Sequence, residues 1–570
     1  MSRERQSNSA RRSPNTGPAG RGRYLFMVTL IVIALGALVG RIAYLNVIDR
    51  DFLQNQGDAR TLRVEPIKAH RGMITDRNGD PLAISTPVVT LWANPQELPS
   101  DPIQLATLAR ALNMEPATLE ARVERYSDHE FMYLRRRMTP EAAQPALALD
   151  MPGVYSKDEY KRYYPSGEVT AQLVGVTNID DQGQEGLELA YNEYLSGQPG
   201  KRRVLKDRKG RLVRDLHLLK DAKPGGDLTL SIDLRLQYMA YRELKKAVDK
   251  RNADGGSLVM MDARSGEVLA MANLPSYNPN NRASIDVAGL RNQAITDAIE
   301  PGSVMKPLAM SAALATDKVD PDTVIDTSPG WMVIDGYTIS DFRNYGKLTP
   351  GGILLHSSNI GMSHIALKLD KDTIWNQYRE LGLGQAPGTG FPGEGSGSLP
   401  SLFGLSRSAQ AAMAYGYGIS LTPLQLASAY TAIANDGRRL RPSLLKRNSP
   451  QLGKQVMSPK IAHELLRMME KIVQPNAGGS RAMVEGYRIA GKTGTVRKVT
   501  DGGYQQKAYR ALFAGIAPVS DPRIVTVVMI DHPKGDAYYG GLVAAPVFGR
   551  VVGKALRLLD VPPDQQEISE

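Results

Sequence analysis

The feature that most restricts this chain is an uncharged apolar run close to its start. The segment "YLFMVTLIVIALGALVG" extends from Tyr24 to Gly40, and the mostly apolar "IAYLNVI" follows Arg41. A helix rises about 1.5 Å per residue, so this stretch is long enough for a hydrocarbon core about 30 Å thick. The alternatives are a buried soluble helix and a cleaved signal peptide, whose apolar region is usually shorter, about 7 to 15 residues. We therefore predict one transmembrane anchor at residues 24–45.

The charge next to this run predicts its orientation. Residues 1–23 contain six arginines and one acid, Glu4, among Ser, Asn, Pro and Gly, which is typical of a disordered basic tail. Basic residues favour the cytoplasmic side of a membrane, so we expect the tail inside the cell and everything after about residue 45 outside. The sequence has no second run of this kind, which predicts a single-pass protein with a large external part.

The residue composition excludes several kinds of chemistry. The 570 residues include no cysteine, so thiol nucleophiles, disulfides and thiolate metal sites are ruled out. The seven histidines show neither HExxH nor another short ligand spacing, and we expect no metal and no cofactor. The formal charge of +11 lies partly in the basic tail, so we do not expect nucleic acid as a partner.

A chain of this length predicts two or three domains. Residues 50–225 are polar and arginine-rich with short apolar runs, and Asn78-Gly79 favours a tight hairpin turn. Pro224 and the two glycines after it interrupt this pattern and mark a boundary. We predict an N-terminal domain at 50–225, a second domain at 226–558 and a disordered tail at 559–570.

The second domain is expected to combine helices and strands. Apolar residues recur at helical spacing in "LRLQYMAYRELKKAVDKR", and "GGSLVMMDARSGEVLAMAN" is typical of two strands joined at "ARSG". "LFAGIAPV" and "RIVTVVMIDHP" predict further strands, and "PVFGRVVGKALRLL" predicts a closing helix. A helix followed by an antiparallel hairpin indicates an α+β or mixed domain.

The stretch "IEPGSVMKPLAM" places a serine three residues before a lysine. Pro301 and Gly302 disfavour helix before Ser303, and Pro307 is tolerated only in the first turn, so Ser303 is predicted at a helix N-terminus. Lys306 is then its i+3 neighbour, and the amine can reach Oγ. A lysine desolvated beside another cation loses proton affinity and can act as general base for a serine nucleophile. The N–H of Ser303 is one candidate donor for an oxyanion hole.

The S-x-x-K pattern alone is weak, because it should occur about once by chance in a chain this long. A second copy runs from Ser443 to Lys446, but it follows a loop and has no fixed helix start. The surroundings of the two copies therefore favour Ser303 as the nucleophile.

Two further short motifs follow Ser303 along the chain. S-x-N occurs three times, from Ser13, Ser276 and Ser357, and only the last copy, which ends at Asn359, begins an apolar helical segment downstream of the nucleophile. K-[ST]-G occurs once, at Lys492-Thr493-Gly494, between strand-like flanks. Gly494 would let a substrate backbone lie against that strand.

Serine-lysine, serine-asparagine and lysine-threonine-glycine in this order are the motif set of penicillin-binding proteins and related β-lactamases. On these residues, and on "RGMITDRNGDPLA", "EGLELAYNEYLSGQPGKR" and "GYGISLTPLQLASAYTAIANDG", the chain resembles a class B penicillin-binding protein over nearly its whole length after the tail. Such a protein is a membrane-anchored peptidoglycan transpeptidase. "AIEPGSVMKP" and "KTGTVRKV" are most similar to the division-specific members, and the elongation-specific members are the nearest alternative.

The resemblance implies a fold, a location and partners. The fold would be one transmembrane helix, an extended α+β pedestal domain of the class B dimerisation type, and an α/β penicillin-binding domain like that of serine β-lactamases, with helices flanking an antiparallel sheet. The N-terminus would lie in the cytoplasm of a bacterium, the anchor in the inner membrane and the catalytic domain in the periplasm. The expected partners are peptidoglycan stem peptides, β-lactams, a polytopic membrane glycosyltransferase of the shape, elongation, division and sporulation family, and other division proteins.

The resemblance also implies the steps of acyl transfer. Ser303 would attack the D-Ala-D-Ala carbonyl, lose its proton to Lys306 and release the terminal D-alanine. Ser357 would relay the proton to the leaving group, and Asn359 would hydrogen-bond Lys306 and hold the substrate amide. An amine from a neighbouring strand would then resolve the acyl-enzyme and form the cross-link.

By the same resemblance, the third motif would bind the substrate. Lys492 would contribute positive potential, and the hydroxyls of Thr493 and Thr495 would receive the substrate carboxylate beside Gly494. The N–H groups of Ser303 and Thr495 would form the oxyanion hole. The segment "RKVTDGGYQQKAYR" after the motif is expected to form a lid-like loop.

Four other functions are weighed against this one. A serine β-lactamase is usually a shorter, soluble domain and needs a deacylating base, for which "SSNIGMSHIALKLDKD" offers no obvious candidate. A β-lactam sensor would need more transmembrane segments, and a bifunctional class A enzyme would need a glycosyltransferase domain after the anchor. A non-catalytic division scaffold would suit residues 50–225 but would leave the three motifs unexplained.

Overall fold

The computed structural model of the protein describes residues 19–47, 62–206, 212–281, 287–449, 451–500 and 503–565. Most of the predicted basic tail and the last five residues of the predicted C-terminal tail lie outside these ranges, as does the S-x-N copy at Ser13. The described part of the C-terminal tail is ordered, so the prediction of disorder is wrong there: Val561 is buried in a hydrophobic core, and Arg488 N donates to Asp564 Oδ1 at 2.7 Å. The chain divides into two compact units, Met1–Lys68 with Pro199–Lys223, and Ala69–Gln198 with Pro224–Glu570.

The first unit contains the N-terminal helix and a small sheet. Helix α1, Ala19–Val47, includes the whole predicted anchor and begins a few residues before it. Its segment Gly22–Val47 is long and apolar enough to cross a membrane, and among the described residues it is the only helix of that kind. The three strands of the sheet pair antiparallel in the order β1 (Leu62–Ile67), β6 (Gly200–Lys206) and β7 (Leu212–Lys220).

The N-terminal part of the second unit is built around the long strand β3, Pro81–Ala93. Its sheet has the order β4-β3-β2-β8, and β5 pairs with β3 as well. Apolar side chains of β3 and β4 form a core with those of helices α3, α4 and α5. The bounds are β2 Ile74–Thr75, α3 Pro102–Ala111, α4 Pro116–Arg125, β4 Met132–Met138, α5 Pro140–Leu147, β5 Val154–Tyr163, α6 Ala171–Val174, α7 Gly186–Ala190, α8 Asn192–Ser196 and β8 Leu228–Thr229.

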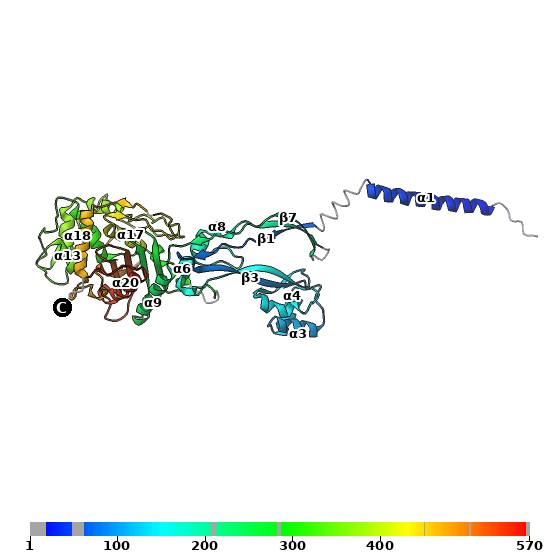
Figure 1. Ribbon diagram of the computed structural model, residues 1–570, viewed down its shortest axis with the longest axis horizontal. Coiled ribbons are helices and arrows are strands. Elements are labelled where there is room, and N and C mark those ends of the chain that lie inside the picture. The colour runs from blue at the N-terminus through cyan, green and yellow to red at the C-terminus, as the bar shows by residue number, and fades with distance from the viewer. Residues whose placement is uncertain are drawn as a thin grey trace, which may run out of the picture. The chain divides into compact units, whose positions relative to one another are not determined.

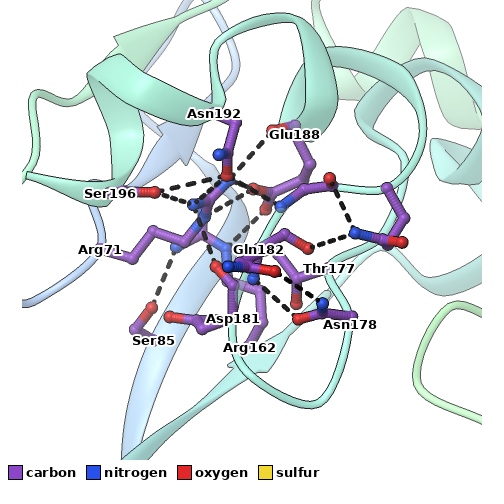
Figure 2. Close-up of polar contacts among 12 residues, drawn as sticks. Arg71, Ser85, Arg162, Thr177, Asn178, Asp181, Gln182, Glu188, Asn192 and Ser196 are labelled. Atoms are coloured by element: carbon purple, nitrogen blue, oxygen red, sulfur yellow. Dashed lines mark hydrogen bonds and ion pairs between the residues drawn. The ribbon is translucent and has the colours of Figure 1, made fainter.

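A buried ion-pair network joins distant segments of this part (Figure 2). Arg71 Nε and Arg162 Nε donate to the two oxygens of the Glu188 carboxylate, at 2.8 and 2.6 Å. Arg71 Nη1 also donates to Asn192 Oδ1 at 3.0 Å and to Ser196 Oγ at 2.8 Å. All three charged side chains are at most 1% exposed, so the network fixes the start of the domain to helices α7 and α8.

The C-terminal part of the second unit contains a five-stranded antiparallel sheet in the order β10-β9-β19-β18-β17. Figure 1 shows this part of the chain in green to red. The predicted hairpin is present as β9 (Gly255–Asp262) and β10 (Val268–Leu274), and the next two predicted strands are β18 (Gly503–Ala517) and β19 (Ile524–Asp531). The third motif lies on the edge strand β17, Ala490–Thr500. The predicted fold of an antiparallel sheet flanked by helices is therefore confirmed.

Helices cover both faces of this sheet. In β9, Val259 and Met261 join a core formed with helices α12 to α18, whereas Leu258 and Met260 join a core formed with α9 and α20. Burial on both faces explains why these strands are continuously apolar in sequence. The helices are α9 Leu234–Lys250, α12 Lys306–Leu314, α13 Pro350–His356, α14 Asn359–Lys368, α15 Thr373–Glu380, α16 Arg407–Ala414, α17 Pro423–Ala434, α18 Pro459–Glu470, α19 Gly540–Val543 and α20 Ala545–Leu558.

One sequence-based expectation about this domain is wrong. The segment 497–510 was expected to form a loop, but β17 continues to Thr500 and β18 begins at Gly503, so most of the segment pairs as an extended hairpin. The reason is visible in its residue types, because valine, threonine and tyrosine favour strands.

Candidate active site

Ser303 lies in a 3₁₀ turn, Gly302–Met305, that leads directly into α12 at Lys306. Gly302 has φ +60°, and a Cβ atom there would come within 2.8 Å of Val496 Cγ1, so glycine is required on both counts. The hydroxyl of Tyr430 donates to Val304 O at 2.6 Å and anchors the turn from α17. Ser303 thus begins the helical segment as predicted, but in a tight 3₁₀ turn that precedes the α-helix.

The amine of Lys306 connects the first motif to the second. It is fully buried, and Nζ donates to Asn359 Oδ1 at 2.8 Å, Ser357 Oγ at 3.2 Å and Ser357 O at 2.5 Å. Ser357 ends α13 with φ +56°, a left-handed conformation that turns its hydroxyl and carbonyl to the same amine. The structure therefore brings Lys306, Ser357 and Asn359 together.

Lys492 brings the third motif to the same hydroxyl. Its Nζ donates to Ser357 Oγ at 3.0 Å and to Thr493 O at 3.1 Å, and the side chain is 1% exposed. Two lysines, one from α12 and one from β17, thus share the oxygen of Ser357. This hydroxyl therefore connects the first and third motifs through the second.

The surroundings weaken the proton affinity of both lysines. Burial, and then the nearby charge of Lys492, holds the pKa of Lys306 well below its ordinary value, although Asp341 opposes this shift. Burial lowers the pKa of Lys492 to about 7. A buried amine with a depressed pKa can accept a proton from a serine at neutral pH far more readily than an exposed lysine can.

Asp341 holds the second motif in place, and our sequence analysis did not identify it. Its carboxylate accepts hydrogen bonds from the N–H of Asn359 at 2.6 Å and of Ile360 at 3.2 Å, and from Ser358 Oγ at 2.5 Å. Ser358 Oγ in turn caps α14 by accepting from Gly361 N at 2.8 Å. A negative charge at this helix N-terminus is stabilising, and the bond to Asn359 N fixes the backbone from which the Asn359 side chain extends.

The edge strand β17 packs directly on the turn that carries Ser303. A Cβ atom on Gly494 would lie 3.0 Å from Val304 Cγ1 and 3.2 Å from Pro301 O. Glycine therefore serves first to bring the strand close to the nucleophile, which is a different reason from the substrate contact predicted for it. Thr493 and Thr495 alternate with Gly494, so both lie on the other side of the strand, and each is half-buried. Thr495 Oγ1 accepts from Gly540 N at 2.9 Å, which ties the strand to α19.

The two S-x-x-K copies differ clearly in the structure. Ser303 Oγ has no hydrogen-bond partner among the described residues, so the predicted contact with the Lys306 amine is not a hydrogen bond in this structure; catalytic hydrogen bonds are often loose before substrate binds. In the other copy, Ser443 Oγ donates to Leu445 O at 2.7 Å, and Lys446 Nζ donates to Arg77 O at 3.0 Å. Ser443 and Lys446 thus point to separate partners.

The fold and this arrangement of three motifs agree with a known family. Residues 256–553 match the model of the penicillin-binding protein transpeptidase domain, and residues 66–230 match that of the penicillin-binding protein dimerisation domain. The chain belongs to the class B penicillin-binding proteins. This penicillin-binding protein has no group of three or more His, Asp or Glu side chains suited to a metal ion within its described ranges.

Named relatives cover nearly the whole length of this penicillin-binding protein. It is 47% identical over 547 residues to the probable peptidoglycan D,D-transpeptidase PbpC of Pseudomonas aeruginosa, covering 96% of this chain and 97% of that protein. It is 43% identical to the peptidoglycan D,D-transpeptidase FtsI of Escherichia coli strain K12, covering 95% and 92%. The crystal structure of penicillin-binding protein 3 from Mycobacterium tuberculosis complexed with aztreonam is similar with a TM-score of 0.68 and 28% identity, covering 88% and 98%.

Proposed function

We propose that this penicillin-binding protein is a serine D,D-transpeptidase that cross-links peptidoglycan stem peptides during septal wall synthesis and is inhibited by β-lactams. The observation that carries the proposal is the buried amine of Lys306, held between Ser357 and Asn359 at the end of the helical turn that carries Ser303. The names of its relatives, which include peptidoglycan D,D-transpeptidases, supply the substrate.

In the acylation half-reaction, Ser303 Oγ attacks the carbonyl carbon of the penultimate D-alanine. Lys306, as a neutral amine, takes the hydroxyl proton while the C–O bond forms. The tetrahedral oxyanion is stabilised by the N–H groups of Ser303 and Thr495. When the C–N bond breaks, Ser357 passes the proton from Lys306 to the leaving amine, and the terminal D-alanine departs.

In the second half-reaction, an amine from a neighbouring stem peptide attacks the acyl-enzyme carbonyl. The amine loses a proton to Lys306 through Ser357, the bond to Ser303 Oγ breaks, and the serine recovers its proton from Lys306. One amide bond is broken and one is formed, so no nucleotide or redox partner takes part. A β-lactam enters by the same attack, but its ring-opened leaving group stays attached, which keeps the site blocked.

The remaining motif residues bind the substrate. Asn359 holds Lys306 with Oδ1, at 2.8 Å, and its amide also orients the backbone of the stem peptide. Lys492 adds positive potential near the terminal carboxylate. The Thr493 and Thr495 hydroxyls receive that carboxylate, and Gly494 keeps the strand close to the nucleophile.

The chain is anchored by a single helix at 24–45 in the bacterial inner membrane, with residues 1–23 in the cytoplasm and the rest in the periplasm. Residues 50–225 form the pedestal domain, and residues 226–558 form the transpeptidase domain. Support comes from the apolar helix Ala19–Val47, from the arginines that precede it in the sequence, and from the two matched family domains.

A polytopic membrane glycosyltransferase supplies the glycan strands, because neither matched domain is a glycosyltransferase. The anchor and the pedestal domain carry the contacts with this enzyme and with other division proteins. Replacing both segments with an unrelated anchor and spacer should abolish recruitment to the septum, while leaving penicillin binding intact. Normal septal recruitment of such a chimaera would contradict this assignment.

The first experiment is covalent labelling with a fluorescent penicillin. We expect long-lived labelling of the full chain in detergent, loss of labelling in Ser303→Ala, and unchanged labelling in Ser443→Ala. Rapid loss of the label from the wild type would indicate a β-lactamase instead. A folded wild type that takes up no label would overturn the enzymatic proposal.

A further inference from the structure

A small hairpin beside the second motif has an exposed apolar face that the proposed chemistry does not use. Strands β12 (Trp331–Ile334) and β13 (Tyr337–Ser340) pair antiparallel through the turn Asp335-Gly336. The inner face is accounted for, because Ile334 and Ile339 pack against Ile360 of α14 and Ala411 of α16.

The outward face combines an aromatic ring with hydroxyl groups. Trp331 is paired with Ser340, and Val333 with Thr338, so these four side chains share one face of the hairpin. Trp331 is 55% exposed and Val333 is 54% exposed, and neither Ser340 nor Thr338 is buried. The face carries no charged side chain. Exposed apolar side chains that gather on one face are candidates for a binding site, whereas singly scattered ones are not.

One more aromatic side chain extends this surface beyond the hairpin. Phe342, just after β13, is 89% exposed, whereas Tyr337 is paired with Ile334 and belongs to the inner face. Between the strand and Phe342 lies Asp341, which accepts the hydrogen bond from Asn359 N at 2.6 Å. The exposed surface is therefore continuous in the chain with the residue that positions the second motif.

The position of Trp331 limits what can reach it from the active site. Trp331 is paired with Ser340, which directly precedes Asp341, so this end of the hairpin lies beside the second motif. A stem peptide separates the sugar from the reacting carbonyl by about four residues, or about 14 Å when extended. A peptide that places its carbonyl at Ser303 could thus place its sugar at the hairpin.

We propose that the outward face of the β12–β13 hairpin binds the N-acetylated sugar backbone of the peptidoglycan strand that supplies the acyl group. The ring of Trp331 stacks on the apolar face of a pyranose, and the hydroxyls of Thr338 and Ser340 bond its polar edge. This inference rests on the proposed function and adds a subsite for the glycan. An uncharged surface with one aromatic ring and neighbouring hydroxyls fits a neutral sugar better than it fits the anionic peptide.

The test uses the full chain in detergent micelles and a peptide-free probe, the hexasaccharide of β-1,4-linked N-acetylglucosamine. Binding is measured by saturation-transfer NMR, and the rate of acylation by fluorescent penicillin is measured in parallel. The variant is Trp331→Ala. The matched control is Tyr238→Ala, because Tyr238 on α9 is also 55% exposed and lies on a different element.

We expect Trp331→Ala to weaken hexasaccharide binding about three- to tenfold, as for loss of one aromatic contact, with penicillin acylation unchanged. Tyr238→Ala should change neither, and Trp331→Tyr should retain most of the binding, which guards against a folding defect in the alanine variant. Equal affinity of the wild type and Trp331→Ala, or no binding by the wild type, would overturn the proposal.

Two further outcomes separate this inference from the other proposals. If the wild type binds the sugar but takes up no penicillin, the glycan site stands and the transpeptidase proposal fails. If Trp331→Ala keeps its affinity for the sugar but loses binding to a purified membrane glycosyltransferase, the face is a protein contact and the glycan proposal is wrong.

Discussion

The carboxylate of Asp341 accepts a 2.6 Å hydrogen bond from the backbone N–H of Asn359. Through this bond a residue outside the three motifs sets the position of the amide that binds Lys306. Asn359 Oδ1 lies 2.8 Å from Lys306 Nζ, so a shift of the start of α14 would alter the hydrogen bond that positions the general base.

Replacing Asp341 should therefore impair chemistry without removing any motif residue. We expect Asp341→Asn to slow acylation by fluorescent penicillin about tenfold, because an amide cannot accept from all three of the donors that the carboxylate serves. The matched control is Asp335→Asn in the same hairpin, whose carboxylate accepts from Ser408 N at 2.8 Å, away from the motif. Similar rates for Asp341→Asn and the wild type would show that Asp341 has only a structural role.

Loss of the general base should impair acylation without destabilising the fold. Lys306→Met removes a buried amine and replaces it with an apolar chain of similar length, so the thermal midpoint should stay the same or rise. Acylation should slow by about 10²- to 10⁴-fold, the usual contribution of general base catalysis. Lys446→Met, in the other S-x-x-K copy, should acylate at the wild-type rate. Normal acylation by Lys306→Met would exclude Lys306 as the base.

Gly494 should tolerate no side chain, because its missing Cβ lets β17 approach the turn of Ser303. Gly494→Ala places a methyl group 3.0 Å from Val304 Cγ1, and either the strand or the turn must give way. We expect acylation to slow at least about tenfold, since small displacements of reacting groups are costly. Gly478→Ala is the control, because a Cβ there meets nothing within 4 Å. A wild-type rate for Gly494→Ala would mean that the strand can relax freely.

The burial of Lys492 predicts how stability depends on pH. Its pKa falls from the ordinary 10.5 to about 7 in the folded protein, so between these values the unfolded chain binds more protons than the folded chain. Stability from this group therefore rises with pH across that window, by at most about 1.4 kcal/mol per pH unit, and its penalty is fully present below pH 7. Lys492→Met removes the penalty.

Thermal midpoints at pH 6.5 and 9.5 check this expectation. The thermal midpoint of Lys492→Met should be clearly higher than that of the wild type at pH 6.5, and the difference between the two midpoints should be smaller at pH 9.5. Lys498→Met in the same strand serves as the control, because Lys498 is paired with Asp531 at 2.8 Å and should show no such gain at low pH. A gap that widens with pH would reverse the sign and contradict a depressed pKa for Lys492.

The sequence predicted the parts of this site that follow from short spacings. Ser303 and Lys306 lie three residues apart, so one helical turn carries both, and Lys492-Thr493-Gly494 was placed on a strand by its flanks. Asp341 could not be predicted, because it lies 18 positions from Asn359 and no short motif contains both residues. The close packing of Gly494 against Val304 could not be predicted either, because the two residues lie close together only in the folded chain.

Local sequence patterns do not predict long-range ion pairs either. Arg71 and Glu188 are separated by 117 positions. Each lies in a segment whose sequence resembles the family, but nothing in either segment predicts that the two side chains meet. "RGMITDRNGDPLA" and "EGLELAYNEYLSGQPGKR" are similar to the family for a physical reason that only the structure reveals. Each contributes one partner of a buried charge pair.

The network around Glu188 supports a final prediction, about stability instead of chemistry. Glu188→Gln removes the carboxylate to which both Arg71 and Arg162 donate, and all three positions are buried (Figure 2). Removing one partner of a buried ion pair usually costs about 3–5 kcal/mol, so the thermal midpoint should fall by several degrees. Glu193→Gln on the exposed side of α8 is the matched control and should leave the midpoint unchanged. If Glu188→Gln instead leaves the midpoint unchanged, the two arginines must find other acceptors, and Glu188 does not hold this domain together.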